Sequence, residues 1–334
     1  MIEELLQSSP GWANFGIFFL IGVVLLLFVL AFVCYAILAE RKVLGYMQLR
    51  HGPNQVGGKW GLLQTIADVL KLLLKEDIIP KAADKPLFII APVIAFAPSF
   101  LVLATIPFTD AFQFADIGVG LLYYIAVSGL TTFGMLLGGW ASNNKYALLG
   151  GMRASAQMIS YEIPLVMSVL GVILLTGSLN LNDMVEAQKH GWFIVLQPIG
   201  FVVFFIASIA ELNRTPFDLP ESENELVAGY HVEYSGFRWA FFMLSEYVYL
   251  FAMSALITVV FLGGWLAPIS FLDFIPGAVW FSLKFCVVVF VYIWLRATLP
   301  RFRADKLMEF GWKVLLPIAL ANIFLTALIK SLFF

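Results

Sequence analysis

Eight apolar stretches, each long enough to cross a lipid bilayer, limit most strongly what this chain can fold into. They cover approximately residues 15–39, 87–107, 119–141, 155–175, 192–212, 239–263, 277–297 and 311–333. A bilayer core about 30 Å thick requires roughly 20 apolar residues in each spanning helix. The strands of an outer-membrane barrel are shorter, about 10 residues, and alternate in polarity. The sequence therefore predicts an all-α integral membrane protein with about eight transmembrane helices, forming a single polytopic domain over residues 1–334.

The composition excludes several other classes of protein. Hydrophobic residues make up 61% of the chain and charged residues 13%, whereas a soluble domain carries about 25% charged residues. A net charge of −2 offers no general basic face for nucleic acid. The two cysteines, Cys34 and Cys286, are too few for an iron–sulfur cluster. Because motifs for ATP, NAD, flavin and metal are also missing, we predict that this chain has no catalytic residues and binds no cofactor or metal itself.

The distribution of basic residues predicts the orientation in the membrane. Of the twenty Lys and Arg residues, seventeen lie in or beside the connections that follow the first, third, fifth and seventh apolar stretches. Basic loops remain on the cytoplasmic side, or on the equivalent matrix side of an organelle. We therefore expect a multi-pass protein of a bacterial inner membrane, or of the mitochondrial inner membrane, with these four connections in the cytoplasm or matrix.

The first connection contains a segment, residues 60–76, with the pattern of an amphipathic helix. Its polar residues Gln64, Asp68, Lys71 and Lys75 are spaced by four, three and four positions, and most other residues are Leu, Ile or Val. This spacing gives one polar stripe on a helix that lies along the membrane surface. The helix is either a plain interfacial anchor or the wall of a chamber that opens to the lipid.

Ionisable residues inside the apolar stretches suggest a function, because they are costly in a membrane. Glu162, Glu246 and Lys284 lie within the fourth, sixth and seventh stretches, Glu211 closes the fifth, and Tyr247 follows Glu246. A chain of carboxylates at increasing depth is typical of a proton path. The alternative is structural pairing of buried charges, with Lys284 neutralising one of the glutamates.

An acidic connection, residues 212–237, follows Glu211 and contains Asp218, Glu221, Glu223 and Glu225. Such a run is either a solvated loop or an ordered lid against something basic. Its prolines and bulky residues favour the lid. In the third stretch, Gly134 and Gly138 form a small-xxx-small pattern that predicts close packing of helices.

Two long charged segments resemble a known family. Residues 40–54 read ERKVLGYMQLRHGPN, and residues 210–230 read AELNRTPFDLPESENELVAGY. Both are similar to signatures of one family of membrane subunits of NADH:quinone oxidoreductase, respiratory complex I. The family comprises mitochondrial subunit 1 and its bacterial counterpart. Further matches at residues 67–71, 145–150, 153–157, 160–164 and 296–305 extend the resemblance over almost the whole chain.

The resemblance implies a role in quinone reduction and in coupling that reaction to proton translocation. It implies three groups of residues: a quinone chamber with Glu40, Arg41, Arg50, Asp68 and Phe217, a coupling loop with Glu211, Asp218, Glu221, Glu223 and Glu225, and a proton path with Glu162, Glu246, Tyr247, Lys284 and Arg296.

The resemblance also implies partners and a substrate. Quinone would be the substrate, and FMN and iron–sulfur clusters would belong to partner subunits. Those partners would be the hydrophilic quinone-site subunits and the antiporter-like membrane arm, within a lipid membrane and without nucleic acid. Two alternatives remain open: the homologous membrane subunit of an energy-converting hydrogenase, and a stand-alone proton or cation transporter.

Overall fold

The computed structural model describes residues 11–110, 112–220, 223–268, 270–272 and 274–333. These residues form helices joined by loops and contain no β-strand. Seven helical segments in this part of the chain are long and apolar enough to cross a membrane. The predicted all-α integral membrane fold is therefore confirmed.

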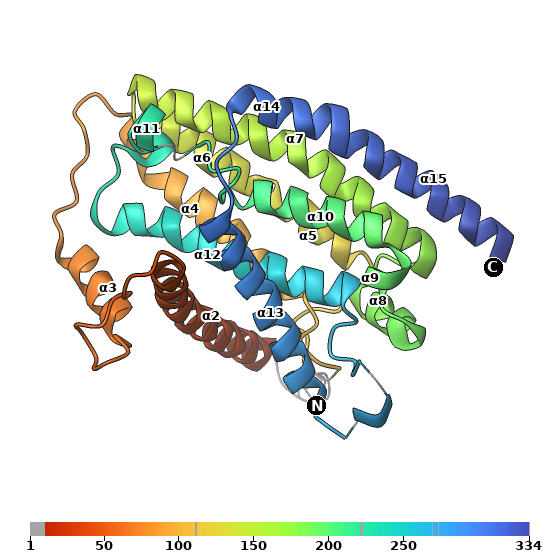
Figure 1. Cartoon of the computed structure of the whole chain (residues 1–334). Helices are drawn as coiled ribbons and strands as arrows, with labels where there is room; N and C mark the ends of the chain where they lie inside the picture. Colours follow the sequence, from red (N-terminus) through yellow and green to blue (C-terminus); the bar gives the residue numbers. More distant parts are fainter. Residues whose placement is uncertain (1–10, 111, 221–222, 269, 273, 334) are drawn as a thin grey trace.

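The long helices lie alongside one another in a bundle, with α12 near its centre (Figure 1). The segments of the bundle are α2 (Gly11–Met47), α4 (Lys85–Leu101), α5 (Gly120–Ser128), α6 (Leu130–Ala141), α7 (Lys145–Thr176), α10 (Pro198–Glu211), α12 (Gly236–Phe261), α13 (Gly277–Thr298), α14 (Ala304–Phe310) and α15 (Leu316–Phe333). Short helices lie between them: α3 (Gln64–Leu74), α8 (Leu181–Ala187), α9 (Phe193–Leu196) and α11 (Glu223–Leu226). The end of the bundle with α3 and α11 is called the loop end, and the end with α8 and α9 the α8 end.

The fifth apolar stretch differs most from its expected form. Instead of one helix over 192–212, it consists of α9 and α10, with Gln197 between them at φ −129° and ψ 54°. Pro198 opens α10, where a missing N–H costs nothing because the first turn has no partner for it. The 14 residues of α10 extend ~21 Å, less than the bilayer core. The structure thus has seven full-length spans and one shorter apolar helix among the residues it describes.

Helix α7 begins ten residues before the expected start of the fourth span at residue 155. Asn144 caps it by accepting a hydrogen bond from the backbone N–H of Tyr146, 2.9 Å away. Gly177, at φ +76°, ends it in the left-handed conformation. The early turns contain Lys145 and Arg153, so hydropathy does not mark them as part of the span. The cap, rather than the apolar window, sets where this helix starts.

The expected amphipathic helix is present as α3, which contacts α2 and α12 at the loop end of the bundle (Figure 1). Thr65 is buried in this contact, and the leucines of α3, such as Leu70 and Leu73, are exposed. The helix therefore presents an apolar face that the described helices of this chain do not cover.

Helix α12 forms the core of the bundle. Every residue from Val248 to Phe261 is buried. Phe251 packs against Phe32 of α2 and Phe285 of α13, with ring centroids 4.9 and 4.8 Å apart. The three helices α2, α12 and α13 are thereby held together by aromatic contacts, which contribute beyond the area that they bury.

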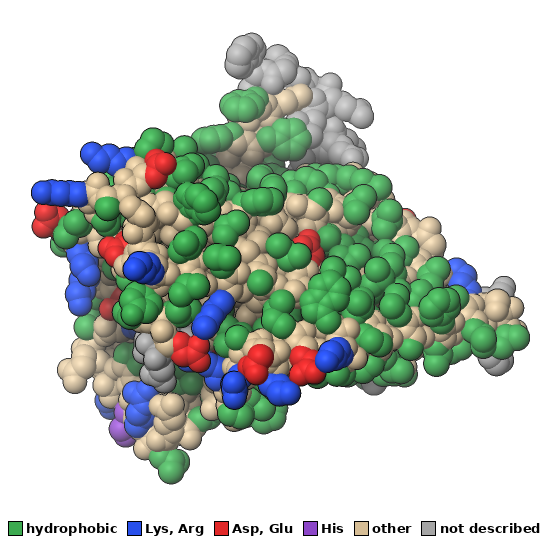
Figure 2. Space-filling model, turned by 90° about the horizontal axis from the view of Figure 1, so that it is seen from above, with side chains coloured by type: hydrophobic (Ala, Val, Ile, Leu, Met, Phe, Trp, Pro, Cys, Tyr) green, Lys and Arg blue, Asp and Glu red, His purple; other side chains and the backbone are tan. Residues whose placement is uncertain are grey.

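The surface of the bundle is mostly apolar. Figure 2 shows one face on which hydrophobic side chains cover a broad area, while charged side chains gather toward one end and along one edge. Phe15 of α2 and Phe324 of α15 are 68% and 74% exposed. A contiguous apolar surface of this extent is stable only against lipid or other apolar helices.

Gly134 shows why the small-xxx-small pattern occurs in the third span. A Cβ at Gly134 would lie 2.4 Å from the backbone nitrogen of Ala95 in α4, and one at Gly138 would lie 3.0 Å from the ring of Phe242. The predicted packing role is confirmed. These glycines allow α6 to approach α4 and α12 closely.

Replacing Gly134 with alanine should destabilise the bundle by about 1–3 kcal/mol, because the backbone of Ala95 cannot move away from the added methyl group. Thermal unfolding of the full-length protein in detergent measures this effect. Gly16→Ala is the matched control, because a Cβ there meets no atom of the described residues within 4 Å. Equal unfolding midpoints for the two variants would contradict the packing role.

Candidate functional site

A buried carboxylate, Glu40, lies at the centre of a charged cluster. Its Oε2 accepts hydrogen bonds from Arg214 at 2.7 Å and from the Tyr247 hydroxyl at 3.1 Å. Its Oε1 accepts one from Arg296. Glu40 is only 4% exposed, and α2, α12, α13 and the loop after α10 all contribute to the cluster. The structure brings together three predicted site residues, Glu40, Tyr247 and Arg296, and adds Arg214.

Arg214 is the most buried cation of this cluster. Its guanidinium carbon lies 4.6 Å from the centre of the Tyr247 ring. Burial opposes its charge, but the Glu40 carboxylate, aided by Tyr247, raises the pKa of Arg214 above its ordinary value. Its Nε and Nη2 have no hydrogen-bond partner among the described residues. Two cations around one carboxylate leave a net positive charge and free donors, which suit an electron-rich oxygen.

A second ion pair joins α2 to the surface helix. Arg41 Nη1 lies 2.5 Å from Asp68 Oδ2, and Gln64 donates to the other carboxylate oxygen at 3.3 Å. Both partners are partly exposed, Arg41 at 48% and Asp68 at 33%. Arg50 lies in the following loop, where its Nε donates to Gln48 at 2.9 Å. Arg41 and Asp68, both assigned to the quinone chamber by the resemblance, therefore form an ion pair, while Arg50 is exposed in the loop.

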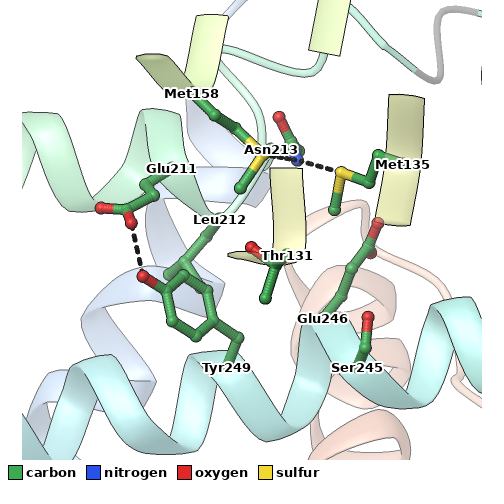
Figure 3. A pocket seen from close by; sticks show the side chains of 9 residues that line it. All are labelled: Thr131, Met135, Met158, Glu211, Leu212, Asn213, Ser245, Glu246 and Tyr249. Carbon is green, nitrogen blue, oxygen red and sulfur yellow. Dashed lines mark hydrogen bonds between the residues drawn. The ribbon is translucent and has the colours of Figure 1, made fainter. Parts of the chain in front are cut away.

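A small cavity of about 10 Å³, called the acidic cavity, lies where α10 and α12 meet α6 and α7 (Figure 3). Glu211 and Glu246 line it from opposite sides, together with Tyr249 and Asn213. Glu211 Oε1 accepts a hydrogen bond from Tyr249 at 2.5 Å, and its Oε2 has no partner among the described residues. Glu246 accepts one from Tyr230 at 3.0 Å. The volume is at the lower limit for one water molecule.

Glu162 extends this acidic region toward α5 and α6. Its Oε1 would lie 3.0 Å from a Cβ at Gly129, so the junction between those two helices leaves room for the carboxylate. Glu162 also lies within electrostatic range of Glu211. The structure thus places the predicted acids Glu162, Glu211 and Glu246 around one region.

Described residues of the acidic loop contact arginines and aromatic rings of neighbouring segments. Asp218 pairs with Arg301 at 2.7 Å, and Glu225 pairs with Arg153 at 2.6 Å. Phe217 stacks on Phe302, with ring centroids 5.6 Å apart. These contacts hold Phe217, Asp218 and Glu225 against other residues of the same chain, two of which are arginines. Of the remaining predicted loop residues, Glu221 lies outside the described residues, and Glu223 begins α11.

Lys284 lies apart from the acids. Its ammonium donates to three backbone carbonyls beyond the end of α12, those of Leu262, Gly264 and Leu266. Sixteen residues separate Glu246 from Leu262, which is ~24 Å along a helix. The structure therefore does not bring this predicted proton-path residue to any of the three glutamates.

Two important residues, Tyr249 and Arg214, lie outside the three residue groups that the resemblance implies. Tyr249 follows Glu246 by three positions, so helical spacing places both on one face of α12 and offers a signal that finds it. Arg214 offers no such signal, because it is 174 residues from Glu40 in sequence. Among the described residues, no group of His, Cys, Asp and Glu could hold a metal ion.

Comparison with known proteins gives consistent results. The profile of the NADH dehydrogenase family matches residues 20–327. The H subunit of the NADH-quinone oxidoreductase of Geobacillus sp. (strain WCH70) is 78% identical over 334 residues, covering the whole of both chains. The proteins of the same name from Anoxybacillus flavithermus and Bacillus cytotoxicus are 78% and 75% identical over the same full length.

Proposed function

This chain belongs to the NADH dehydrogenase family, and on that premise we propose that it is the membrane subunit of a proton-pumping NADH:quinone oxidoreductase. In this proposal it forms much of the quinone chamber and couples quinone reduction to proton translocation. One turn of α12 carries the proposal. Tyr247 on this turn contacts Glu40, Tyr249 contacts Glu211, and Glu246 lines the cavity beside Glu211. A single rigid segment thus touches both the charged cluster and the acidic cavity.

The chamber is proposed to open to the lipid beside α3. The exposed leucines of α3 suit the apolar tail of a quinone, and the Arg41–Asp68 pair lies where α2 meets this helix. Deeper in the protein, Arg214 and Arg296 surround Glu40 and can stabilise negative charge on a quinone oxygen. Phe217 and the exposed Arg50 are assigned to the walls of the same chamber.

The coupling follows from the charge balance of the reaction. A quinone takes up two electrons and two protons to become a quinol. Electrons that arrive before protons add negative charge near the Glu40 cluster, which repels the carboxylate and attracts the two arginines. Because Tyr247 bonds to Glu40, a shift of Glu40 moves the turn of α12 that also carries Glu246 and Tyr249. Glu162, Glu211 and Glu246 then exchange protons as their surroundings change.

The redox cofactors belong to other subunits in this proposal. The electrons would reach quinone through FMN and iron–sulfur clusters in the hydrophilic subunits, and the protons would be moved together with the antiporter-like arm. The three relatives are bacterial, which supports the inner membrane of a bacterium. The loop end, with its basic connections, would face the cytoplasm.

Gentle purification of the tagged chain from its membrane tests this function. The expected product is a large complex that contains flavin and iron–sulfur clusters and transfers electrons from NADH to quinone. A complex that evolves hydrogen instead would favour the hydrogenase alternative. A monomer or homo-oligomer that transports ions without redox partners would contradict both.

The ion pair at the mouth of the proposed chamber allows a charge-swap prediction. Arg41→Asp and Asp68→Arg each place like charges where the nearest atoms are now 2.5 Å apart, so each should raise the KM for a long-tailed quinone several-fold. The double variant restores opposite charges and should recover most of the affinity. A water-soluble short-tailed quinone serves as the control substrate. Three variants with the same KM as the unchanged protein would remove this pair from the quinone path.

A further inference from the structure

At the end of α12 near Lys284, several backbone carbonyls have donor partners from other elements. The last carbonyls of any helix lack donor partners within the helix, and in a bilayer each unsatisfied group is costly. Here the N–H of Gly264 donates to Thr258 O at 2.8 Å. The side-chain amide of Gln188 donates to the carbonyls of Val259 and Val260 at 2.9 and 3.3 Å. Side chains from other elements thus complete this helix end.

Lys284 provides the cationic part of the arrangement. Its Nζ lies 2.7 Å from Leu262 O, 3.0 Å from Gly264 O and 2.6 Å from Leu266 O. The indole ring of Trp192 lies on another side, with its centroid 4.5 Å from Nζ. These three carbonyl oxygens and the ring are called the carbonyl cage. Backbone carbonyls and an aromatic face are the groups that bind a small ammonium ion.

Two glycines in the turn after α12 give the cage its shape. Gly263 and Gly264 both have positive φ, +73° and +51°. A Cβ at Gly263 would lie 3.0 Å from the Trp192 ring, and one at Gly264 would lie 2.8 Å from the Val185 side chain. Only glycine fits these conformations without strain or contact. The turn that directs the carbonyls toward Nζ therefore depends on both residues.

We propose that the carbonyl cage is a binding site for a primary ammonium, that Lys284 occupies it from within the chain, and that this fixes α13 against the end of α12. Three donated hydrogen bonds require all three hydrogens of the charged form, since a neutral amine has only two. The three oxygens are backbone carbonyls, which cannot accept a proton for transfer. Lys284 is thus a fixed charge, and the proton path runs elsewhere.

The clamp acts on the site through two helices. Lys284 and Arg296 lie on α13, twelve residues or ~18 Å apart, and Tyr247 lies on α12. Both Arg296 and Tyr247 bond to Glu40. Fixing the register of α13 against α12 therefore sets how these two groups meet the carboxylate. This part of the inference rests on the proposed function and makes Lys284 a positioning residue.

Chemical rescue of Lys284→Ala in the purified complex tests the cage. Alanine keeps Cβ, so the atoms removed correspond to n-propylammonium. The variant should unfold at a temperature lower by at least about 6 °C, because three carbonyls lose a charged donor. Millimolar n-propylammonium should restore at least half of that loss, whereas 1-propanol, which has the same chain length but no charge, should not. Equal rescue by both compounds, or by neither, would overturn the cage.

Lys284→Met keeps the proposal testable if the alanine variant fails to assemble, since methionine fills the space of the lysine methylene chain without carrying a charge. We expect a lower unfolding temperature and a KM for quinone raised several-fold. Electron transfer from NADH to an artificial acceptor that takes electrons from the flavin should be unchanged. Ser282→Ala is the matched control, because the hydroxyl hydrogen bond that the described residues give it lies within α13, to Ala278 O. A methionine variant with native stability would overturn the clamp. The stability and rescue measurements test the cage independently of the proposed function.

Discussion

Glu40→Gln should abolish most quinone reduction and destabilise the protein by about 3–5 kcal/mol, the cost of leaving a buried charge without its partner. The substitution keeps the shape of the side chain but removes its charge. Arg214, with its side chain 4% exposed, then loses its only described ion-pair partner. Arg296, 33% exposed, loses less because water reaches it. Thermal unfolding and NADH:quinone activity of the purified complex measure the two effects.

A double substitution separates stability from function in this cluster. Replacing a buried ion pair by apolar residues of similar volume is often neutral, so Glu40→Met with Arg214→Met should regain much of the lost stability. Activity should stay low, because the charges near the quinone are gone. Glu186→Gln is the control for losing the charge of a glutamate in an ion pair, because Glu186 forms an exposed pair with Lys189. Full activity in the double variant would exclude the cluster from quinone reduction.

Local patterns in the sequence were sufficient to predict several features of the fold. Apolar length predicted the spans, because the bilayer sets the length of a helix. The four–three–four spacing predicted α3 because a helix repeats every 3.6 residues. Gly134 indicated close packing because only a residue without Cβ allows contact between helix backbones. Each of these inferences needs only neighbouring residues and a known geometry.

The partners of the charged residues could not be predicted in this way. Arg296 bonds to Glu40 across 256 residues of sequence, and pairing at that distance depends on how the helices pack. The sequence suggests Lys284 either as part of a proton path or as the partner of one of the glutamates. Its partners are backbone carbonyls, and no side chain in the sequence marks those. A charged residue inside a span therefore indicates that some partner must offset the free-energy cost of burying the charge. The residue itself does not identify that partner.

Glu211→Gln should lower the rate of proton pumping more than it lowers the rate of electron transfer. The amide oxygen can still accept the hydrogen bond from Tyr249, 2.5 Å away, so the fold should be little changed. The amide cannot take up or release a proton. General acid–base groups contribute about 10²–10⁴-fold to the steps that they serve, and we expect a loss of at least ~10-fold in proton pumping. A pH-sensitive dye inside proteoliposomes, with NADH and quinone supplied, measures the rate.

Tyr249→Phe distinguishes the proton of Glu211 from its hydrogen bond. This variant keeps the carboxylate and removes the hydroxyl that orients it, so pumping should fall by less than in Glu211→Gln. If both variants lose pumping equally, the orientation of the carboxylate is the limiting feature, and Glu211 need not carry a proton. If Glu211→Gln pumps normally while Glu40→Gln is inactive, the coupling runs through α12 to Glu246 without Glu211. The order of the two losses therefore decides which carboxylate of the acidic cavity receives the signal from the Glu40 cluster.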